Sequence, residues 1–223
     1  MTTTKDAYHH GDLRNALVEA AIALVKDVGA EQFSLRDAAR TVGVSANATY
    51  RHFDSKSALL TAVAAAGLAK MAARMQRRLA PLDTPRGVDD RDVAVERFKV
   101  VARAYVDFGV DNAELFRVMF GPSGICKMLV TAEPGGPRLP RDVLDGVLDD
   151  LVVVGLLPTH KRAGAVLAVW TMLHGFTSLA TQVGEGFAVG AQRKAALEAL
   201  LGFTLDGLMA DSEGGPPLAP PGC

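Results

Sequence analysis

The chain has 223 residues, of which 49% are hydrophobic and 22% are charged, with a formal net charge of −1. This length allows about two small domains, and the composition supports substantial apolar cores. The two cysteines, Cys126 and Cys223, exclude a disulfide framework and a cysteine metal site, and they fit a reducing cytoplasm.

The N-terminal region begins with a polar segment and continues into a helix. Its first thirteen residues, MTTTKDAYHHGDL, contain no apolar stretch of the signal-peptide type. A helix is predicted over about Leu13–Val28, and Gly29 is expected to end it. One face of this helix carries apolar residues at helical spacing, namely Leu13, Leu17, Ala20, Leu24 and Val28.

Residues 34–53, SLRDAARTVGVSANATYRHF, predict two short helices joined by a tight turn. Ser34 caps the first helix, and Gly43 ends it because glycine turns there without a Cβ penalty. The apolar face of this helix is Leu35, Ala38, Ala39 and Val42. Ser45 caps the second helix, expected over Ala46–Phe53. Because that helix has little apolar surface beyond its two aromatic residues, its other side chains suit the major groove of DNA.

A long helix is predicted over Lys56–Leu79, with Asp54 or Ser55 as its cap. A linker with two prolines and a glycine follows, and we expect the domain boundary there. The second domain is expected to contain helices at about 90–111, 113–120, 141–155, 159–183 and 190–210, with 123–131 left open and a loop at 134–140. The expected organisation is an arm and first domain over 1–56, a connecting helix over 57–80, a second domain over 81–210 and a disordered tail over 211–223.

One apolar segment has to be weighed as a membrane span. Residues 163–184 contain no charged side chain over twenty-two positions, which is long enough to cross a bilayer. Polar residues and three glycines dilute this segment, and the sequence has no second one like it. We therefore expect a helix buried on most sides in an all-α core, and no membrane partner.

Roughly fifty residues of the N-terminal region resemble a known family in register. The run LRNALVEAAIALVKDVGAEQFSLRDAARTVGVSANATYRHFDSKSALL resembles the DNA-binding domain of the tetracycline-repressor family of one-component bacterial regulators. Thr49 departs from the family pattern, because most members carry Leu there. The run from Trp170 to Gly175 resembles the Trp-x-x-x-His-Gly pattern of one branch of that family.

The resemblance implies an all-α fold of about nine helices. It has an N-terminal three-helix DNA-binding domain and a C-terminal domain that binds a ligand at its centre. The last two helices would pair with their twofold mates as a four-helix dimer interface. The leucines expected at this interface are Leu167, Leu197, Leu201, Leu205 and Leu208.

Basic residues concentrate near the predicted helix-turn-helix. Residues 34–56 hold Arg36, Arg40, Arg51 and Lys56 against Asp37 and Asp54. The Arg74–Arg78 cluster is interpreted as a cationic helix C-terminus, which the helix dipole favours. The predicted DNA-binding residues are Arg14, Ser34, Arg36, Ser45, Ala46, Asn47, Ala48, Tyr50, Arg51, His52 and Lys56.

Individual roles at the DNA are expected to differ. Asn47 is the best base reader, through bidentate contact with adenine. The Tyr50 ring is expected to pack while its hydroxyl contacts phosphate, and Lys56 is expected to contact phosphate at a helix start. Arg51 and His52 either reach the DNA or remain solvated. The Tyr8-His9-His10-Gly11 arm either adds contacts or is an ordinary disordered terminus.

Aromatic and methionine side chains in the second half suggest a ligand pocket. The candidate lining residues are Tyr105, Phe108, Phe116, Met119, Phe120, Trp170, His174 and Phe176. Residues of these types at helical spacing also form ordinary packed cores, so both readings stay open. His174 is either a polar anchor for a ligand or a satisfied core histidine, and it is too isolated for a metal site.

Catalytic and cofactor motifs are missing from the sequence. Gly121-Pro122-Ser123-Gly124 fails the G-x-S-x-G spacing, no P-loop occurs, and Asp149-Asp150 is expected on a solvated face. We therefore expect no enzyme, no cofactor and no metal. The sequence predicts a cytoplasmic homodimer that a small apolar or amphipathic effector releases from a palindromic operator in double-stranded DNA. The alternative is a constitutive dimeric DNA-binding protein whose C-terminal domain only dimerises.

Overall fold

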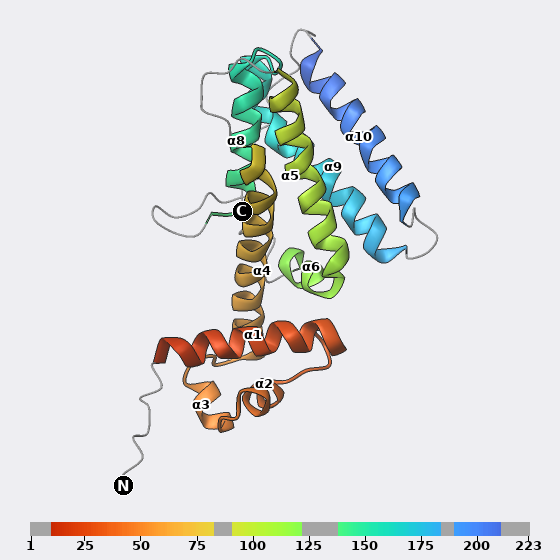
Figure 1. The fold of residues 1–223 in the computed structure, drawn as a ribbon. Coiled ribbons are helices and arrows are strands. Elements are labelled where there is room, and N and C mark those ends of the chain that lie inside the picture. The colour runs from red at the N-terminus through yellow and green to blue at the C-terminus, as the bar shows by residue number, and fades with distance from the viewer. Residues whose placement is uncertain (1–9, 83–90, 122–137, 184–189, 211–223) are drawn as a thin grey trace. The chain divides into compact units, whose positions relative to one another are not determined.

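The computed structural model describes residues 10–82, 91–121, 138–183 and 190–210, and every regular element within them is a helix (Figure 1). The all-α prediction is confirmed. In chain order the elements are α1 (His10–Val28), α2 (Leu35–Val42), α3 (Ala46–Tyr50), α4 (Lys56–Leu79), the 3-10 turn η1 (Ala80–Leu82), α5 (Arg91–Asp111), α6 (Ala113–Phe120), α8 (Pro140–Val153), the 3-10 turn η2 (Thr159–Lys161), α9 (Arg162–Gln182) and α10 (Ala191–Met209).

The helix boundaries agree closely with those expected from local signals. Gly29, at φ +83°, follows the last residue of α1, and α6 covers the predicted residues 113–120. Ser55 accepts a hydrogen bond from the Ala58 N–H and is therefore the cap of α4. The recognition helix α3 is shorter than expected, because it ends at Tyr50 rather than Phe53. The open segment 123–131, most of the expected loop and the tail from residue 211 lie outside the described residues.

The chain forms two compact units. The first unit comprises residues 1–67 and 112–125, and the second comprises 68–111 and 126–223. The division therefore falls inside α4, whereas the sequence suggested a boundary in the linker after it. It also assigns α6 to the first unit, although α6 follows α5 in the chain.

The core of the first unit joins α1, α2, α4 and α6. Leu17, Ala21 and Val25 of α1 are fully buried, and α1 packs against both α2 and α6. At Gly67 of α4 an added Cβ would lie 2.7 Å from the Met119 side chain. The absence of a side chain at Gly67 therefore allows α4 and α6 to approach closely.

The core of the second unit is built around α5, which packs against α8 and α9 (Figure 1). Large apolar side chains such as Phe98 and Leu148 are fully buried there. Charged side chains fasten the edges of this core, for example Arg97 to Asp150 at 2.9 Å. The apolar interior and its ion-paired edges fix α5, α8 and α9 as one packed group.

The burial of α9 differs from the prediction. Only one face is buried within the chain, through Ala165, Val169, Leu173, Phe176 and Thr177, while Leu179 and several other residues remain exposed. The expectation of burial on most sides is therefore wrong for a single chain. Residues 56–82 and 159–182 each form helical segments long and apolar enough to cross a membrane by length and composition, a property that core helices also have.

The expected dimer residues of α10 also need correction. Leu197, Leu201, Leu205 and Leu208 are between 0% and 7% exposed in the single chain, so they pack inside their own protomer. The spacing of these leucines indicated an apolar face but not what covers it. In the structure this face is covered by other parts of the same chain, including α9. Phe203 of the same helix is 75% exposed instead. Leu167 of α9 is half-buried.

Candidate nucleic-acid interface

Both ends of α2 are fixed by short-range hydrogen bonds. The Ser34 N–H donates to an Asp37 carboxylate oxygen at 2.8 Å, and the Asp37 N–H donates to the Ser34 hydroxyl oxygen at 3.3 Å. At the other end Gly43 has φ +78°, a left-handed conformation that favours glycine. The capping box and the glycine turn thus set the angle at which the chain enters α3.

The carboxylate of Asp37 is stabilised in its charged form. Hydrogen bonds from the Ser34 side chain and backbone hold the pKa of Asp37 below its usual range, and the charge of Arg40 adds to the effect. Arg40 also forms an ion pair with Asp37. A negative charge in the first turn of α2 is favourable because it lies at the positive end of the helix dipole.

The recognition helix α3 presents a short polar surface. Its cap is Ser45, whose hydroxyl oxygen accepts the Ala48 N–H at 3.2 Å. Asn47 and Arg51 are exposed, whereas Ala46, Ala48 and His52 are half-buried. Asn47 is thus free of the protein core and available to a base edge.

Two neighbouring residues of α3 lie in different environments. Thr49 is fully buried, and its hydroxyl oxygen has no hydrogen-bond partner. Tyr50 is 49% exposed, so its side chain is packed only in part. The physical reason is the helical spacing, which points Thr49 inward and therefore turns its neighbour Tyr50 outward.

Phe53 and Arg14 stabilise the segment after α3. Phe53 is almost fully buried, and the Arg14 guanidinium lies 5.0 Å from the centre of its ring. This cation–π contact connects α1 to the end of the helix-turn-helix. The exposed Arg14 therefore has a structural contact besides its predicted role at DNA.

Lys56 is held in place at the start of α4. Its ammonium donates to the Glu31 carbonyl oxygen at 2.7 Å and lies 5.1 Å from the centre of the Phe33 ring. An ammonium has three N–H donors, and the carbonyl uses one of them. The contact orders the side chain without neutralising its charge. Lys56 therefore keeps the positive charge and the two N–H donors with which it could bind a phosphate.

An open groove of about 420 Å³ unites these elements. It is lined by Ser34, Leu35, Arg36, Tyr50, Asp54, Ser55 and Lys56. The starts of α2 and α4 both lie at this groove, and helix starts bring N–H groups and a positive partial charge. The lining has two basic side chains, Arg36 and Lys56, against the one carboxylate of Asp54, and this surplus of positive charge suits a phosphate of the DNA backbone.

The structure sorts the predicted DNA-binding residues into three groups. Ser34, Arg36, Tyr50 and Lys56 line the groove. The second group lies on α3 and at its end, outside the groove lining: Ala46, Asn47, Ala48 and Arg51. The third group is also outside the lining and consists of Arg14, Ser45 and His52. Sequence reasoning omitted Leu35, Asp54 and Ser55 from the site, although Ser55 was recognisable as a helix cap.

The expected ligand residues divide between the units. Phe116, Met119 and Phe120 belong to α6 in the first unit, and the other five belong to α5 and α9 in the second. In the second unit, the Tyr105 hydroxyl lies 3.3 Å from the His174 Nδ1 atom. The Trp170 and His174 rings are stacked, with their centres 5.3 Å apart.

This aromatic cluster contains a poorly satisfied donor. The Trp170 indole nitrogen is buried and makes no hydrogen bond of normal geometry, although the Tyr105 hydroxyl lies close enough to interact with it. Burial raises the pKa of the Tyr105 hydroxyl above its usual range, an effect that the neighbouring Trp170 indole partly opposes. Burial lowers the pKa of His174. Tyr105 and His174 are therefore both neutral at pH 7.

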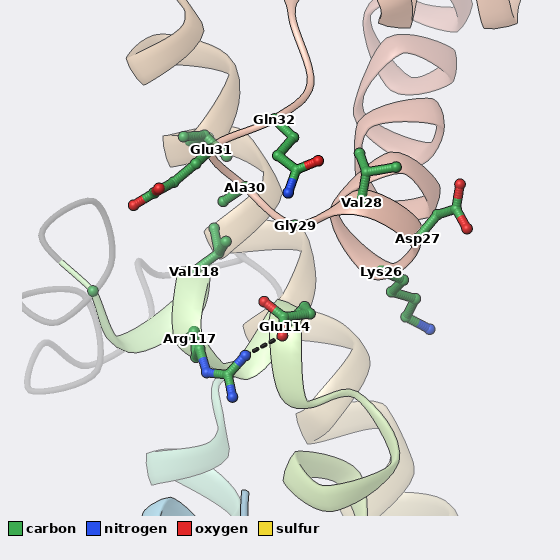
Figure 2. Close-up of a pocket in the computed structure, with 12 residues that line it drawn as sticks. Lys26, Asp27, Val28, Gly29, Ala30, Glu31, Gln32, Glu114, Arg117 and Val118 are labelled. Carbon is green, nitrogen blue, oxygen red and sulfur yellow. Dashed lines mark hydrogen bonds and ion pairs between the residues drawn. The ribbon is translucent and has the colours of Figure 1, made fainter. Parts of the chain in front are cut away.

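A larger cavity of about 730 Å³ lies within the first unit, between the end of α1 and α6. Figure 2 shows Lys26 and Asp27 projecting from the last turn of α1, and Arg117 beside Glu114 on α6. Arg117 and Glu114 form an ion pair. The lining mixes both charges, and none of the predicted site residues belongs to it. Among the described residues, no group of three or more His, Cys, Asp or Glu side chains gathers as a metal site.

Comparisons with known proteins identify related sequences and folds. The family model described as "Bacterial regulatory proteins, tetR family" matches residues 17–63, and "Tetracyclin repressor-like, C-terminal domain" matches residues 98–204. A search among curated proteins finds no match. The two family models together cover the helix-turn-helix and most of the second unit.

Solved structures share the fold. A protein of unknown function from Rhodococcus sp. RHA1 is 25% identical, with a TM-score of 0.69 over 92% of this chain and 100% of that chain. A possible TetR family transcriptional regulator from Streptomyces coelicolor A3(2) is 23% identical, with a TM-score of 0.59 over 87% and 98%. A TetR variant from Acinetobacter baumannii AYE in complex with minocycline is 21% identical, with a TM-score of 0.53 over 87% and 93%.

Proposed function

Because this chain belongs to the tetracycline-repressor family of DNA-binding transcriptional regulators, we propose that it is a homodimeric repressor that a small molecule releases from its operator. The groove at the starts of α2 and α4 carries the DNA-binding part of this proposal. It combines Arg36, Lys56 and the Tyr50 hydroxyl with two helix starts, an arrangement suited to one backbone phosphate. A phosphate bound there would fix the register of α3 in the major groove.

Base reading is assigned to Asn47. Its exposed amide lies in the first turn of α3, which is the part of a recognition helix that meets base edges. The neighbouring Ala46 and Ala48 are small, so they permit α3 to approach the floor of the DNA major groove closely. Arg51, exposed at the end of α3, contributes a positive charge near the backbone.

The ligand-responsive part is supported by the cluster of Tyr105, Trp170 and His174. A buried indole N–H without a well-formed hydrogen bond is unfavourable, and a ligand with a carbonyl, hydroxyl or ether oxygen would supply one. The neutral Tyr105 and His174 favour an uncharged or weakly polar ligand over an ion. The proposed effector is therefore an aromatic or apolar molecule that carries one hydrogen-bond acceptor.

Dimerisation is proposed through the uncovered faces of α9 and α10. Phe203, Leu179 and Val183 are the large exposed apolar residues of these two helices and their ends. Exposed apolar side chains on these helices would be buried against a second copy of the chain, and a twofold dimer is the commonest arrangement. A dimer would also complete the burial of α9. The protein would then act as a cytoplasmic regulator, without a membrane partner.

Selection of genomic fragments by the purified protein tests the DNA-binding proposal. Sequencing the bound fragments should reveal a near-palindromic motif, with half-sites about 34–36 Å apart or a multiple of that distance. Asn47→Ala should flatten the preference at one or two base pairs, each worth about 1–3 kcal/mol. Retention of the full preference by Asn47→Ala would remove this residue from the base-reading role.

The ligand response needs a separate measurement. Thermal shifts with a library of uncharged aromatic compounds should identify binders, and Trp170 fluorescence should report them because it is the only tryptophan. Saturation with an effector should lower operator affinity about 5–150-fold, the usual range of coupling between sites. Binding of these compounds without any change in operator affinity would instead favour a constitutive DNA-binding dimer.

A further inference from the structure

A basic cavity of about 390 Å³ lies in the second unit, between α5, the end of α4 and the start of α10. Four basic side chains line it: Arg78 of α4, Arg103 of α5, and Arg193 and Lys194 of α10. Two carboxylates, Asp107 and Glu198, also line it. None of these residues belongs to the aromatic set expected to hold the effector.

The two carboxylates already have arginine partners. Arg103 donates to both Glu198 oxygens, at 2.6 and 2.8 Å, and also to Glu96 at 2.7 Å. Asp107 lies 3.9 Å from Arg74, which comes from outside the cavity lining. Arg74 makes its shorter ion pair, at 2.8 Å, with Asp111, and the lining has four basic side chains against the two carboxylates.

Arg78, Arg193 and Lys194 make no ion pair with any residue that the structure describes. Of these three, Lys194 acts electrostatically on the nearby carboxylate of Glu198. Hydrogen bonds from Arg103 are the largest cause that lowers the pKa of Glu198, and the charges of Lys99 and Lys194 lower it further. The cavity thus has a surplus of positive charge from side chains on two different helices.

The start of α10 adds to this surplus. Gly190 is the N-cap residue, lines the cavity and provides no side chain to accept the free N–H groups of the first turn. Arg78 and Arg193 contribute planar groups whose paired N–H donors match the oxygens of a phosphate. The walls also include apolar residues, among them Val100 and Leu197.

We propose that this cavity binds a small phosphate-bearing molecule, held by Arg78, Arg193 and Lys194. The phosphate would occupy the basic end, and the organic part would lie against the apolar wall. A volume of about 390 Å³ falls in the range of small-molecule sites and exceeds what inorganic phosphate fills. The chain would then have a second ligand site, whose chemistry is opposite to that of the aromatic cluster.

Calorimetric titration of the full-length protein tests the proposal, with AMP, inorganic phosphate and uncharged adenosine as probes. AMP should bind and adenosine should not, because the phosphate supplies the recognised charge. Arg193→Gln and Lys194→Gln should each weaken AMP binding about tenfold or more, the loss of one charge-assisted hydrogen bond. Tighter binding of AMP than of inorganic phosphate identifies an organic phosphate as the ligand, and equal binding identifies free phosphate.

The matched control is Arg77→Gln, which removes one arginine charge next to Arg78 from a residue outside the cavity lining. It should leave AMP affinity unchanged within about twofold. Equal loss in Arg77→Gln and Arg193→Gln would overturn the proposal, because it would show general charge attraction. Absence of AMP and phosphate binding would overturn it too. AMP could also fail to bind while Arg193→Gln weakens the binding of the protein to duplex DNA of unrelated sequence. That result would show that the surface contacts nucleic acid instead.

Discussion

The ammonium of Lys56 lies 2.7 Å from the carbonyl oxygen of Glu31, a residue 25 positions earlier in the chain. This contact ties the start of α4 to the loop before α2, and both helices begin at the same groove. The residue expected to bind DNA therefore also orders the site in which it acts. Substitutions of Lys56 should therefore change both the affinity for DNA and the dependence of that affinity on salt.

Lys56→Ala should weaken binding to every DNA sequence and lower the salt slope of the logarithm of affinity by about one unit, because one phosphate contact is lost. Lys56→Arg keeps the charge and should preserve most of the slope. Filter binding or fluorescence anisotropy at several salt concentrations measures the effect. Lys26→Ala, an exposed lysine at the end of α1, serves as the control. An unchanged slope in Lys56→Ala would exclude Lys56 from phosphate binding.

Thr49→Val should stabilise the first unit by about 1 kcal/mol, because it replaces a buried hydroxyl without a partner by a methyl group of similar shape. Thermal unfolding measures the change. Thr61→Val is the matched control, since the Thr61 hydroxyl donates to the Ser57 carbonyl oxygen at 3.0 Å and its removal should bring no gain. A loss of stability in Thr49→Val would mean that the hydroxyl has a favourable partner in solution.

Gly67→Ala should destabilise the protein by about 1–3 kcal/mol, because the new Cβ would overlap the Met119 side chain at 2.7 Å. Gly146→Ala provides the comparison, since Gly146 lies within α8 with nothing within 4 Å of the added Cβ. That substitution should stabilise the helix by about 0.5–1 kcal/mol. Denaturant unfolding gives both values. Equal stabilisation by the two substitutions would show that Met119 yields without cost.

Asp37→Asn should lower the stability of the folded protein near neutral pH. In acid the substitution should have little effect. The pKa of Asp37 is lower in the folded protein, so its charged form contributes stability above the unfolded pKa. That contribution disappears as the pH falls through the lower folded pKa. The difference in Tm between wild type and Asp37→Asn should therefore narrow below about pH 4. Asp27→Asn controls for the removal of one surface carboxylate, and a gap that stays constant with pH would contradict the prediction.

Phe203→Glu should convert the proposed dimer to a folded monomer, because it places a charge in the proposed interface. Val153→Glu is the matched control: Val153 is an equally conspicuous exposed apolar residue, at the end of α8 and outside that interface. Analytical ultracentrifugation distinguishes the two states. A Phe203→Glu protein that remains dimeric, or a wild-type protein that is already monomeric, would reject the interface on α9 and α10.

Local sequence signals determined the ends of the helices. Ser34 and Gly43 act on N–H and carbonyl groups within four or five residues of themselves, so their effect on α2 is readable without the rest of the fold. The same holds for Gly29 after α1 and for the polar surface of α3. The sequence therefore predicted the helix-turn-helix and the exposed amide of Asn47, since both depend on neighbours along the chain.

Tertiary packing decided which apolar face is covered and by what. The leucines of α10 and the exposed Phe203 lie on the same helix. Only the packing within the chain shows that the leucines are buried and that Phe203 is exposed. Packing also brought α6 into the first unit and left the Trp170 indole without a well-formed hydrogen bond. These properties depend on residues far apart in sequence, and the periodicity of one helix specifies an apolar face but not its neighbour.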